Sequence, residues 1–219
     1  MTSKCEIEQK VAEFLLQIKA IKLQPNNPFT WASGWKSPIY CDNRITLSHP
    51  AIRTYIRQKL TSLVQEEFGS VSVIAGVATA GIPQGVLVAQ ELGLPFIYVR
   101  AKAKEHGREN LIEGEFSPGQ RVVVVEDLIS TGKSSLQAIQ ALRDGGCEVA
   151  GLVGIFNYGF DAAEENFKNA KCRFLTLSNY SALIEYAAEH SFISAEELKL
   201  LRTWREDPQN WGTEKKATI

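Results

Sequence analysis

The fold follows from one segment of the chain, Arg121-Val-Val-Val-Val-Glu126-Asp127-Leu-Ile-Ser130-Thr131-Gly132-Lys133-Ser134-Ser135. Its four consecutive valines predict a strand that is buried on both faces, as strands are in parallel sheets. Two acids follow, then small residues, and then a helix-like run at residues 133–143. In open α/β sheets, ligands bind where the carboxyl end of a strand meets such a helix. The segment therefore predicts an α/β protein with a ligand site at this junction.

The residues of this junction favour a phosphorylated sugar as the ligand. Small residues let backbone N–H groups approach a phosphate, and the helix N-terminus adds a favourable dipole. Glu126 and Asp127 cannot face a bare phosphate, so we expect them to hold sugar hydroxyls, a metal ion or both. A Walker-type nucleotide loop is excluded, because it needs a glycine five residues before Gly132 and that position is Asp127. A solvated turn remains as the alternative.

Composition describes an ordinary soluble protein. The chain has 219 residues, with 44% hydrophobic and 22% charged residues and a net charge of -1, which suits one domain with a sizeable core. This charge gives no sign of a nucleic-acid surface. Cys5, Cys41, Cys147 and Cys172 form no C-x-x-C pair, so neither a zinc cluster nor a disulfide framework is indicated. Charged residues interrupt the amphipathic N-terminal helix, which argues against a signal peptide or a membrane span. We expect a cytoplasmic protein with neither nucleic acid nor a membrane as a partner.

Strands and helices alternate along most of the chain. Strands are expected at residues 71–75, 95–99, 121–125, 149–156 and 174–177. Helices are expected within the first twenty residues, from Ser48 and Pro50 to about 68, and at 82–92, 133–144, 178–189 and 194–204. Residues 29–44 predict a hairpin, and the tail from residue 208 should be loose. Such alternation favours a parallel sheet covered by helices on both faces.

One segment departs from the alternation. Between residues 99 and 121 the chain has little apolar content, and its basic residues stand at positions 100, 102, 104 and 108 around His106. A structureless insertion of this length is usually functional and often a lid. Its charges would suit closure over a polyphosphate. A disordered surface loop is the alternative.

Three segments together resemble the type I phosphoribosyltransferases, enzymes that bind 5-phosphoribosyl 1-diphosphate (PRPP). The acid pair before Ser130-Thr131-Gly132 resembles their PRPP fingerprint. The pattern Arg100-x-Lys102-x-Lys104-x-His106-Gly107 resembles the mobile catalytic loop of the members that use orotate, and residues 29–44 resemble the amino-terminal segment of those members. The resemblance implies the type I phosphoribosyltransferase fold in a single domain, residues 1–219. Its parts would be an N-terminal helix and hairpin hood (1–47), a PRPP-binding core (71–180) and a mobile loop.

The resemblance also implies an activity and its site residues. The chain would transfer the phosphoribosyl group of PRPP to orotate, giving orotidine 5'-monophosphate and diphosphate. Lys104, Arg100 and His106 would act in catalysis and bind PRPP. The other expected PRPP-binding residues are Glu126, Asp127, Leu128, Ile129, Ser130, Thr131, Gly132, Lys133 and Ser134. Within this set the two acids would hold the ribose hydroxyls, and residues 130–134 would surround the 5-phosphate. Ser130 would also contact orotate. Mg²⁺ is expected through PRPP and water, and a homodimer in which each loop closes over the partner's site.

The chain departs from the family pattern at several positions. Some relatives have lysines where this chain has Ala32, Ala80 and Ala101, and the candidates to replace them are Lys36 and Lys102.

Other parts of the pattern carry their own expectations. Residues 76–81 are expected to admit the diphosphate to backbone N–H groups, although packing explains their glycines nearly as well. Tyr40, Asp42 and Arg44 are expected to support the sheet edge. Two rival functions stay open, a phosphoribosyltransferase for purines or uracil and a regulator that has lost catalysis.

Overall fold

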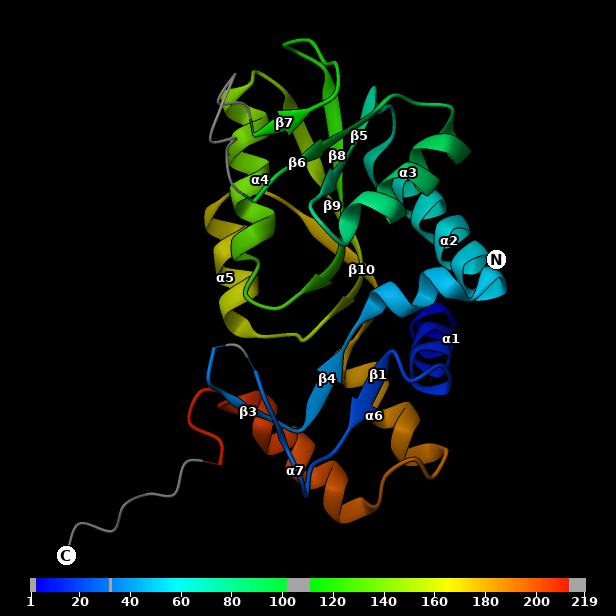
Figure 1. The fold of residues 1–219 in the computed structure, drawn as a ribbon, viewed down its shortest axis with the longest axis vertical. Helices are drawn as coiled ribbons and strands as arrows, with labels where there is room; N and C mark the ends of the chain where they lie inside the picture. Colours follow the sequence, from blue (N-terminus) through cyan, green and yellow to red (C-terminus); the bar gives the residue numbers. More distant parts are fainter. Residues whose placement is uncertain (1–2, 32, 102–110, 213–219) are drawn as a thin grey trace, which may run out of the picture.

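A six-stranded sheet forms the centre of the computed structural model, which describes residues 3–31, 33–101 and 111–212 (Figure 1). Its strands, in spatial order, are β10 (Phe174–Asn179), β9 (Glu148–Asn157), β8 (Arg121–Ile129), β5 (Val73–Val77), β6 (Phe96–Val99) and β7 (Ile112–Glu113). Neighbouring strands are parallel except for β7, which runs antiparallel to β6. The expected parallel sheet is therefore confirmed, with a short antiparallel strand added at one edge.

The two faces of the sheet are covered by different helices. The helices are α1 (Lys4–Gln17), α2 (Pro50–Phe68), α3 (Gly81–Leu92), α4 (Lys133–Asp144), α5 (Asp161–Asn169), α6 (Tyr180–Glu189) and α7 (Ala195–Glu206). Figure 1 shows α4 and α5 on one side of the sheet and α2 and α3 on the other. Among the described residues, no helix has both the length and the apolar character needed to cross a membrane.

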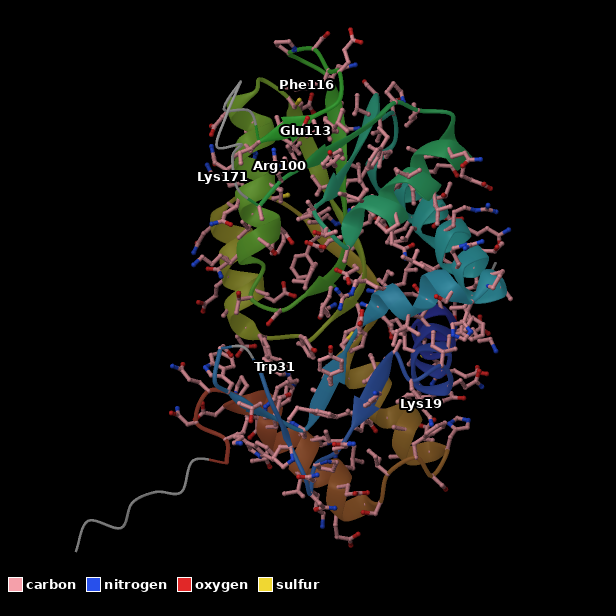
Figure 2. The ribbon with its side chains drawn as sticks, in the orientation of Figure 1. Lys19, Trp31, Arg100, Glu113, Phe116 and Lys171 are labelled. Carbon is pink, nitrogen blue, oxygen red and sulfur yellow. The ribbon has the colours of Figure 1, made fainter. Side chains whose placement is uncertain are left out.

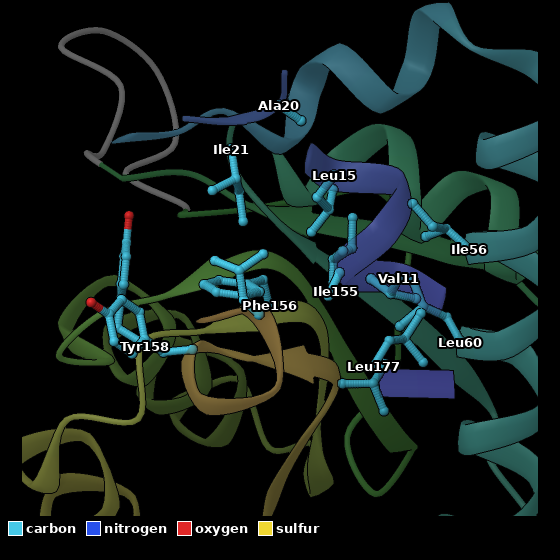
Figure 3. Close-up of a cluster of buried hydrophobic side chains, with 14 of the residues drawn as sticks. Val11, Leu15, Ala20, Ile21, Ile56, Leu60, Ile155, Phe156, Tyr158 and Leu177 are labelled. Carbon is cyan, nitrogen blue, oxygen red and sulfur yellow. The ribbon is translucent and has the colours of Figure 1, made fainter. Parts of the chain in front are cut away.

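The four valines of β8 connect two hydrophobic cores. All four are fully buried. Side chains alternate along a strand, so Val123 and Val125 join the core under α2 and α3, while Val122 and Val124 join the core under α4 and α5. Figure 3 shows part of the first core, where Leu15 of α1 lies near strand β9. The valine run therefore forms the doubly buried strand that its sequence predicts.

A second layer lies across the carboxyl ends of the parallel strands. It contains β1 (Ile21–Leu23) paired with β4 (Ile39–Cys41), β2 (Phe29–Thr30) paired with β3 (Lys36–Ser37), and the 3-10 helix η1 (Asn43–Ser48). We call residues 21–48 the hood. The expected single hairpin at 29–44 is corrected, because β4 leaves β3 and pairs with β1 instead.

The C-terminal helices complete the hood. The indole N–H of Trp204 in α7 donates to the Lys36 carbonyl at 3.2 Å, and the Trp204 ring meets that of Trp31 edge to face. Trp211 also packs against the main core. The part of the tail at residues 208–212 is therefore attached to the fold, and residues 213–219 lie outside the described residues.

Several element bounds differ from the expected ones. Strand β8 extends to Ile129, four residues beyond the expected end at residue 125, because it stays paired with β9 as far as Asn157. Strand β5 covers 73–77 rather than 71–75, so Gly76 and Val77 belong to a strand and not to a loop. Helix α5 and strand β7 were not expected, and α2 begins at Pro50, since Ser48 ends η1.

Candidate active site

The site lies at the switch point of the sheet. From β5 the chain continues to β6 on one side, and it later returns to β8 on the other side of β5. The loops after β5 (residues 78–80) and after β8 (residues 130–132) therefore follow the carboxyl ends of two neighbouring parallel strands, with β8 continuing to Ile129 after its last pair with β5, Val125 with Gly76. This is the position where open α/β sheets bind ligands.

The acid pair belongs to strand β8 and not to the loop after it. The two carboxyls lie close enough to hydrogen-bond, but their surroundings differ. Glu126 is only 5% exposed, and its carboxylate accepts hydrogen bonds from the Ser135 hydroxyl at 3.2 Å and from the Asp127 N–H at 3.0 Å. Asp127 is half-buried and faces the hood. Asp127 is therefore the more accessible of the two acids.

Burial sets the protonation of this pair. It raises the pKa of the Glu126 carboxyl well above its usual range, and the adjacent charge of Asp127 raises it further. Burial also raises the pKa of Asp127, while hydrogen bonding to Glu126 and the charge of Arg44 oppose that rise. Two such carboxyls take up a proton at higher pH than separate acids do. They can accept hydrogen bonds from hydroxyl groups, as the ribose expectation requires.

The loop after β8 leads directly into a helix N-terminus. Helix α4 starts at Lys133, and the residue before it, Gly132, has φ 77°. A Cβ at Gly132 would lie 2.5 Å from the Phe167 ring, so only glycine fits. The first-turn N–H groups of α4 receive no side-chain cap at Gly132. An uncapped helix start next to small residues is a natural place for a phosphate.

Helix α5 supports this loop from below. The Asn166 amide donates to the Thr131 carbonyl at 3.0 Å, and Phe167 packs under Gly132. Sequence reasoning missed both residues together with their helix, and it also missed Ser135, one position past the expected phosphate loop. The Phe160, Ala163 and Phe167 spacing, with acids in the first turn, was the signal for α5.

The loop after β5 also belongs to this site. We call the region between this loop, residues 126–134 and the hood the crevice. A Cβ at Gly81 would lie 2.4 Å from the Val125 carbonyl, so the start of α3 is held directly against β8. Helix α3 also lacks a side-chain cap at Ala80, and the peptide bond between Ala78 and Thr79 is cis. Close packing accounts for Gly81. At the start of α3 the Ile82 N–H donates to the Thr79 carbonyl at 3.3 Å and Pro83 has no N–H, so this helix start offers fewer donors to a ligand than the start of α4.

Arg100 lies beside these loops. Its guanidinium is 3.4 Å from the Glu113 carboxylate of β7, and Figure 2 shows the pair at the edge of the sheet near α4. A cavity of about 330 Å³ is lined in part by Ala78, Arg100 and Ser134. It brings together the loop after β5, the basic segment and the start of α4. Lys102, Lys104 and His106 lie outside the described residues.

The hood side chains have mostly structural contacts. Asp42 accepts two hydrogen bonds from the Arg44 guanidinium, at 2.6 and 2.9 Å, and the Tyr40 ring packs against Phe29. The Lys36 ammonium donates to Thr30 at 2.8 Å across the β2–β3 hairpin. These contacts agree with the supporting roles expected for residues 40, 42 and 44. The ammonium of Lys36 is engaged within the hairpin by its bond to Thr30. Ala32 lies outside the described residues.

The remaining expected site residues are close to the crevice. Leu128 and Ile129 form the last part of β8, with Leu128 half-buried and Ile129 buried. Ser130 is half-buried, directly after the strand, whereas Lys133 and Ser134 are exposed in the first turn of α4. The structure thus brings residues 126–134 together with Arg100 and the loop after β5. Which atoms contact a substrate stays a prediction.

Comparison with known proteins gives one consistent result. Residues 45–189 match the family model described as "Phosphoribosyl transferase domain". The chain is 58% identical, over 209 residues, to orotate phosphoribosyltransferase of Bacteroides thetaiotaomicron, a match that covers 95% of this chain and 99% of the relative.

Solved structures agree with this match. Orotate phosphoribosyltransferase from Aeropyrum pernix superimposes with a TM-score of 0.74 at 27% identity, covering 84% of this chain and 99% of that one. The Mycobacterium tuberculosis H37Rv enzyme in complex with PRPP gives a TM-score of 0.62 at 25% identity, with 81% and 98% coverage.

Proposed function

The chain belongs to the phosphoribosyltransferase family, among the orotate phosphoribosyltransferases that it matches over nearly its whole length, and we infer that it shares their reaction. It transfers the 5-phosphoribosyl group of PRPP to orotate and releases diphosphate, forming orotidine 5'-monophosphate in pyrimidine biosynthesis. The observation that carries this proposal is the switch-point crevice, where an acid pair at the end of β8 adjoins the uncapped start of α4.

Each of the three parts of PRPP, the 5-phosphate, the ribose and the diphosphate, has a matching set of residues in this crevice. The 5-phosphate would sit on the backbone N–H groups of residues 130–134 at the start of α4. The ribose hydroxyls would donate to Asp127, with Glu126 beneath it. The diphosphate would extend toward Arg100 and the backbone of the loop after β5. Each contact pairs negative oxygens with N–H donors or hydroxyl donors with carboxylates, and none sets phosphate against an acid.

The chemical difficulty is charge separation at the anomeric carbon. As diphosphate leaves, positive charge grows on the ribose and negative charge grows on the departing oxygens. Preorganised donors that meet this charge lower the barrier most. We assign that role to Arg100, Lys104 and His106, which would act once water is excluded from the site. Orotate carries its own negative charge, so the reaction does not demand a strong general base.

Orotate itself would bind between Ser130 and the hood. Ser130 follows β8 directly, and the hood lies across the same carboxyl ends of the strands (Figure 1). The base would therefore approach the anomeric carbon from the side opposite the departing diphosphate.

Mg²⁺ would bind at this site together with PRPP, through oxygens of the substrate and of water. Among the described residues, no three His, Cys, Asp or Glu side chains are grouped closely enough to hold a metal ion. The acid pair would supply at most two carboxylates, so PRPP and water would provide the other oxygens, as is common for this ion. When bound, the ion would neutralise part of the charge on the leaving diphosphate.

We propose a homodimer in which the basic segment of one subunit closes over the crevice of the other. This proposal rests on the family resemblance of residues 100–107. We also place the reaction in the cytoplasm, where the free thiols of Cys5, Cys41, Cys147 and Cys172 would stay reduced.

A parallel assay of acceptor bases tests the proposed function. PRPP consumption is measured with orotate, uracil, adenine, xanthine and hypoxanthine under one set of conditions. Orotate alone should support rapid turnover. Turnover with uracil or a purine instead would assign the chain to another branch of the family. PRPP binding without turnover of any base would identify a regulator.

A further inference from the structure

Asn43 connects the hood to the acid pair. It is the first residue of η1 and is fully buried. Its side-chain amide donates to the backbone carbonyl of Asp127 at 2.7 Å, although 84 residues separate the two in the sequence. The partner is the backbone of the acid that faces the crevice, so this contact acts on the position of Asp127 itself.

Asp127 has no register partner in the sheet, although Glu126 and Leu128 on either side of it pair with β9. Strand β8 pairs with β5 only as far as Val125, whose partner is Gly76. Beyond that pair the chain of β5 turns away into the loop at residues 78–80. A buried carbonyl without a donor is costly. The amide of Asn43 therefore holds the backbone of Asp127 at a point of β8 where the regular strand pairing is interrupted.

The orientation of this amide is fixed by its own neighbours. The Cys41 thiol donates to the Asn43 Oδ1 at 3.4 Å, which leaves the Nδ2 group facing Asp127. The Thr46 hydroxyl donates to the Asn43 carbonyl at 2.6 Å and accepts from the Gln84 amide of α3 at 3.3 Å. Thr46 and Gln84 are buried as well. A buried polar network thus joins the hood, the start of α3 and the acid pair.

We propose that Asn43 is a positioning residue for PRPP, which holds Asp127 where its carboxylate receives the ribose hydroxyls. The proposal rests on the proposed function, since it takes PRPP as the ligand of the crevice. Asn43 touches no reacting atom. Its effect passes through the backbone of Asp127, so its loss weakens the use of PRPP more than the use of orotate.

Two substitutions and one matched control test this role. Asn43→Ala removes the donor, and Asn43→Asp keeps the size of the side chain but cannot donate as a carboxylate. Ser178→Ala is the control, because the Ser178 hydroxyl is equally buried and donates to a distant backbone carbonyl, that of Glu8, at 2.8 Å. Asn43→Asp and Ser178→Ala each lose one buried hydrogen bond, and Asn43→Ala also loses the contact with the Cys41 thiol, but only the Asn43 variants lose a bond at the site.

The measurement is steady-state kinetics with each substrate varied against a saturating amount of the other, alongside thermal unfolding. Both Asn43 variants should lower kcat/KM for PRPP roughly tenfold or more, while KM for orotate changes less than about twofold. Ser178→Ala should lose comparable thermal stability and keep both kinetic constants.

Three results would overturn the proposal. The first is a kcat/KM for PRPP in the Asn43 variants equal to that of Ser178→Ala. The second is an equal loss for PRPP and orotate, and the third is failure of both Asn43 variants to fold where Ser178→Ala folds. Wild-type protein in the same assay distinguishes failure of the proposed function from failure of the positioning role of Asn43. If it does not turn over orotate, the proposed function fails, and if it does, only the positioning role is being judged.

Discussion

Glu126 and Asp127 are neighbours in the chain with different surroundings in the fold. Glu126 points toward Ser135 of α4 and is almost fully buried, whereas Asp127 faces the hood and stays half-buried. Adjacent acids in the sequence predicted a site for sugar hydroxyls. Their unequal exposure depends on their place inside β8, between α4 and the hood, which the sequence alone did not show.

We expect Glu126→Gln to stabilise the protein at neutral pH and to reduce its activity. The folded-state pKa of Glu126 is raised above the unfolded value of about 4.3. Between these values the folded protein binds more protons than the unfolded chain, so stability falls as pH rises through that window. The substitution removes this loss. Its stabilising effect should be absent below about pH 4 and should grow toward neutral pH.

Thermal unfolding across pH measures this effect, with Glu165→Gln on the exposed surface of α5 as the control. A Glu126→Gln profile that parallels the control at every pH would show that burial of this carboxyl costs no stability.

Lys104→Ala should lower kcat much more than it raises KM. One preorganised contact to developing charge is worth ~2.7–4 kcal/mol, or about 10²–10³-fold in rate. Steady-state kinetics measure this, with Lys168→Ala as an exposed control on α5. A near-normal kcat for Lys104→Ala would remove this lysine from the mechanism.

At the scale of elements, two effects act on Gly132 in the expected phosphate loop. One is the contact with Phe167 of α5, and the other is the backbone strain that any residue with a side chain would have at a positive φ. Gly132 and Gly93 both have positive φ, 77° and 65°, but only Gly132 has a side chain, Phe167, within reach of an added Cβ. Gly93→Ala should cost about 1–2 kcal/mol from backbone strain alone. Gly132→Ala should cost more and should also raise KM for PRPP.

Chemical denaturation and PRPP kinetics on the two glycine variants give the comparison. Equal stability losses with unchanged KM in both would mean that the close contact with Phe167 does not shape the loop.

The sequence predicted the bounds of helices with a full apolar stripe better than the bounds of strands, which depend on pairing with distant strands. Helix α4 has the expected bounds, since its apolar period and the following Gly145-Gly146 mark it locally. The end of β8 was wrong because Glu126 and Asp127 look like a strand terminus, while pairing with β9 carries the strand to Ile129. Helix α5 was missed because Ala163 and Phe167 are its only buried residues.

At the scale of the whole molecule, segments from the N-terminal and C-terminal parts of the chain meet at the hood. Trp204 binds the backbone of Lys36, and Asn26 donates to Glu197 at 3.0 Å. The expected hood at residues 1–47 is therefore incomplete without α7. No local pattern indicates this union, because it joins residues more than 160 positions apart.

Sharing of the site between subunits has a direct test. Mixing inactive Lys104→Ala with inactive Asp127→Asn should restore activity, because hybrid dimers contain one site with an intact loop and an intact acid. Random exchange in a twofold dimer predicts about a quarter of the wild-type activity per subunit. Failure to recover activity under verified subunit exchange would contradict loop donation between subunits.

The proposed function requires orotate and PRPP to react in the crevice at the end of β8. The most direct measurement is the initial rate of orotidine 5'-monophosphate formation by wild type, by Asp127→Asn, and by Asp161→Asn as an exposed acid control on α5. Wild type and Asp161→Asn should form the product at equal rates, with Asp127→Asn slower by about 10² or more. Absence of product from wild type, or equal rates in all three, would contradict the account.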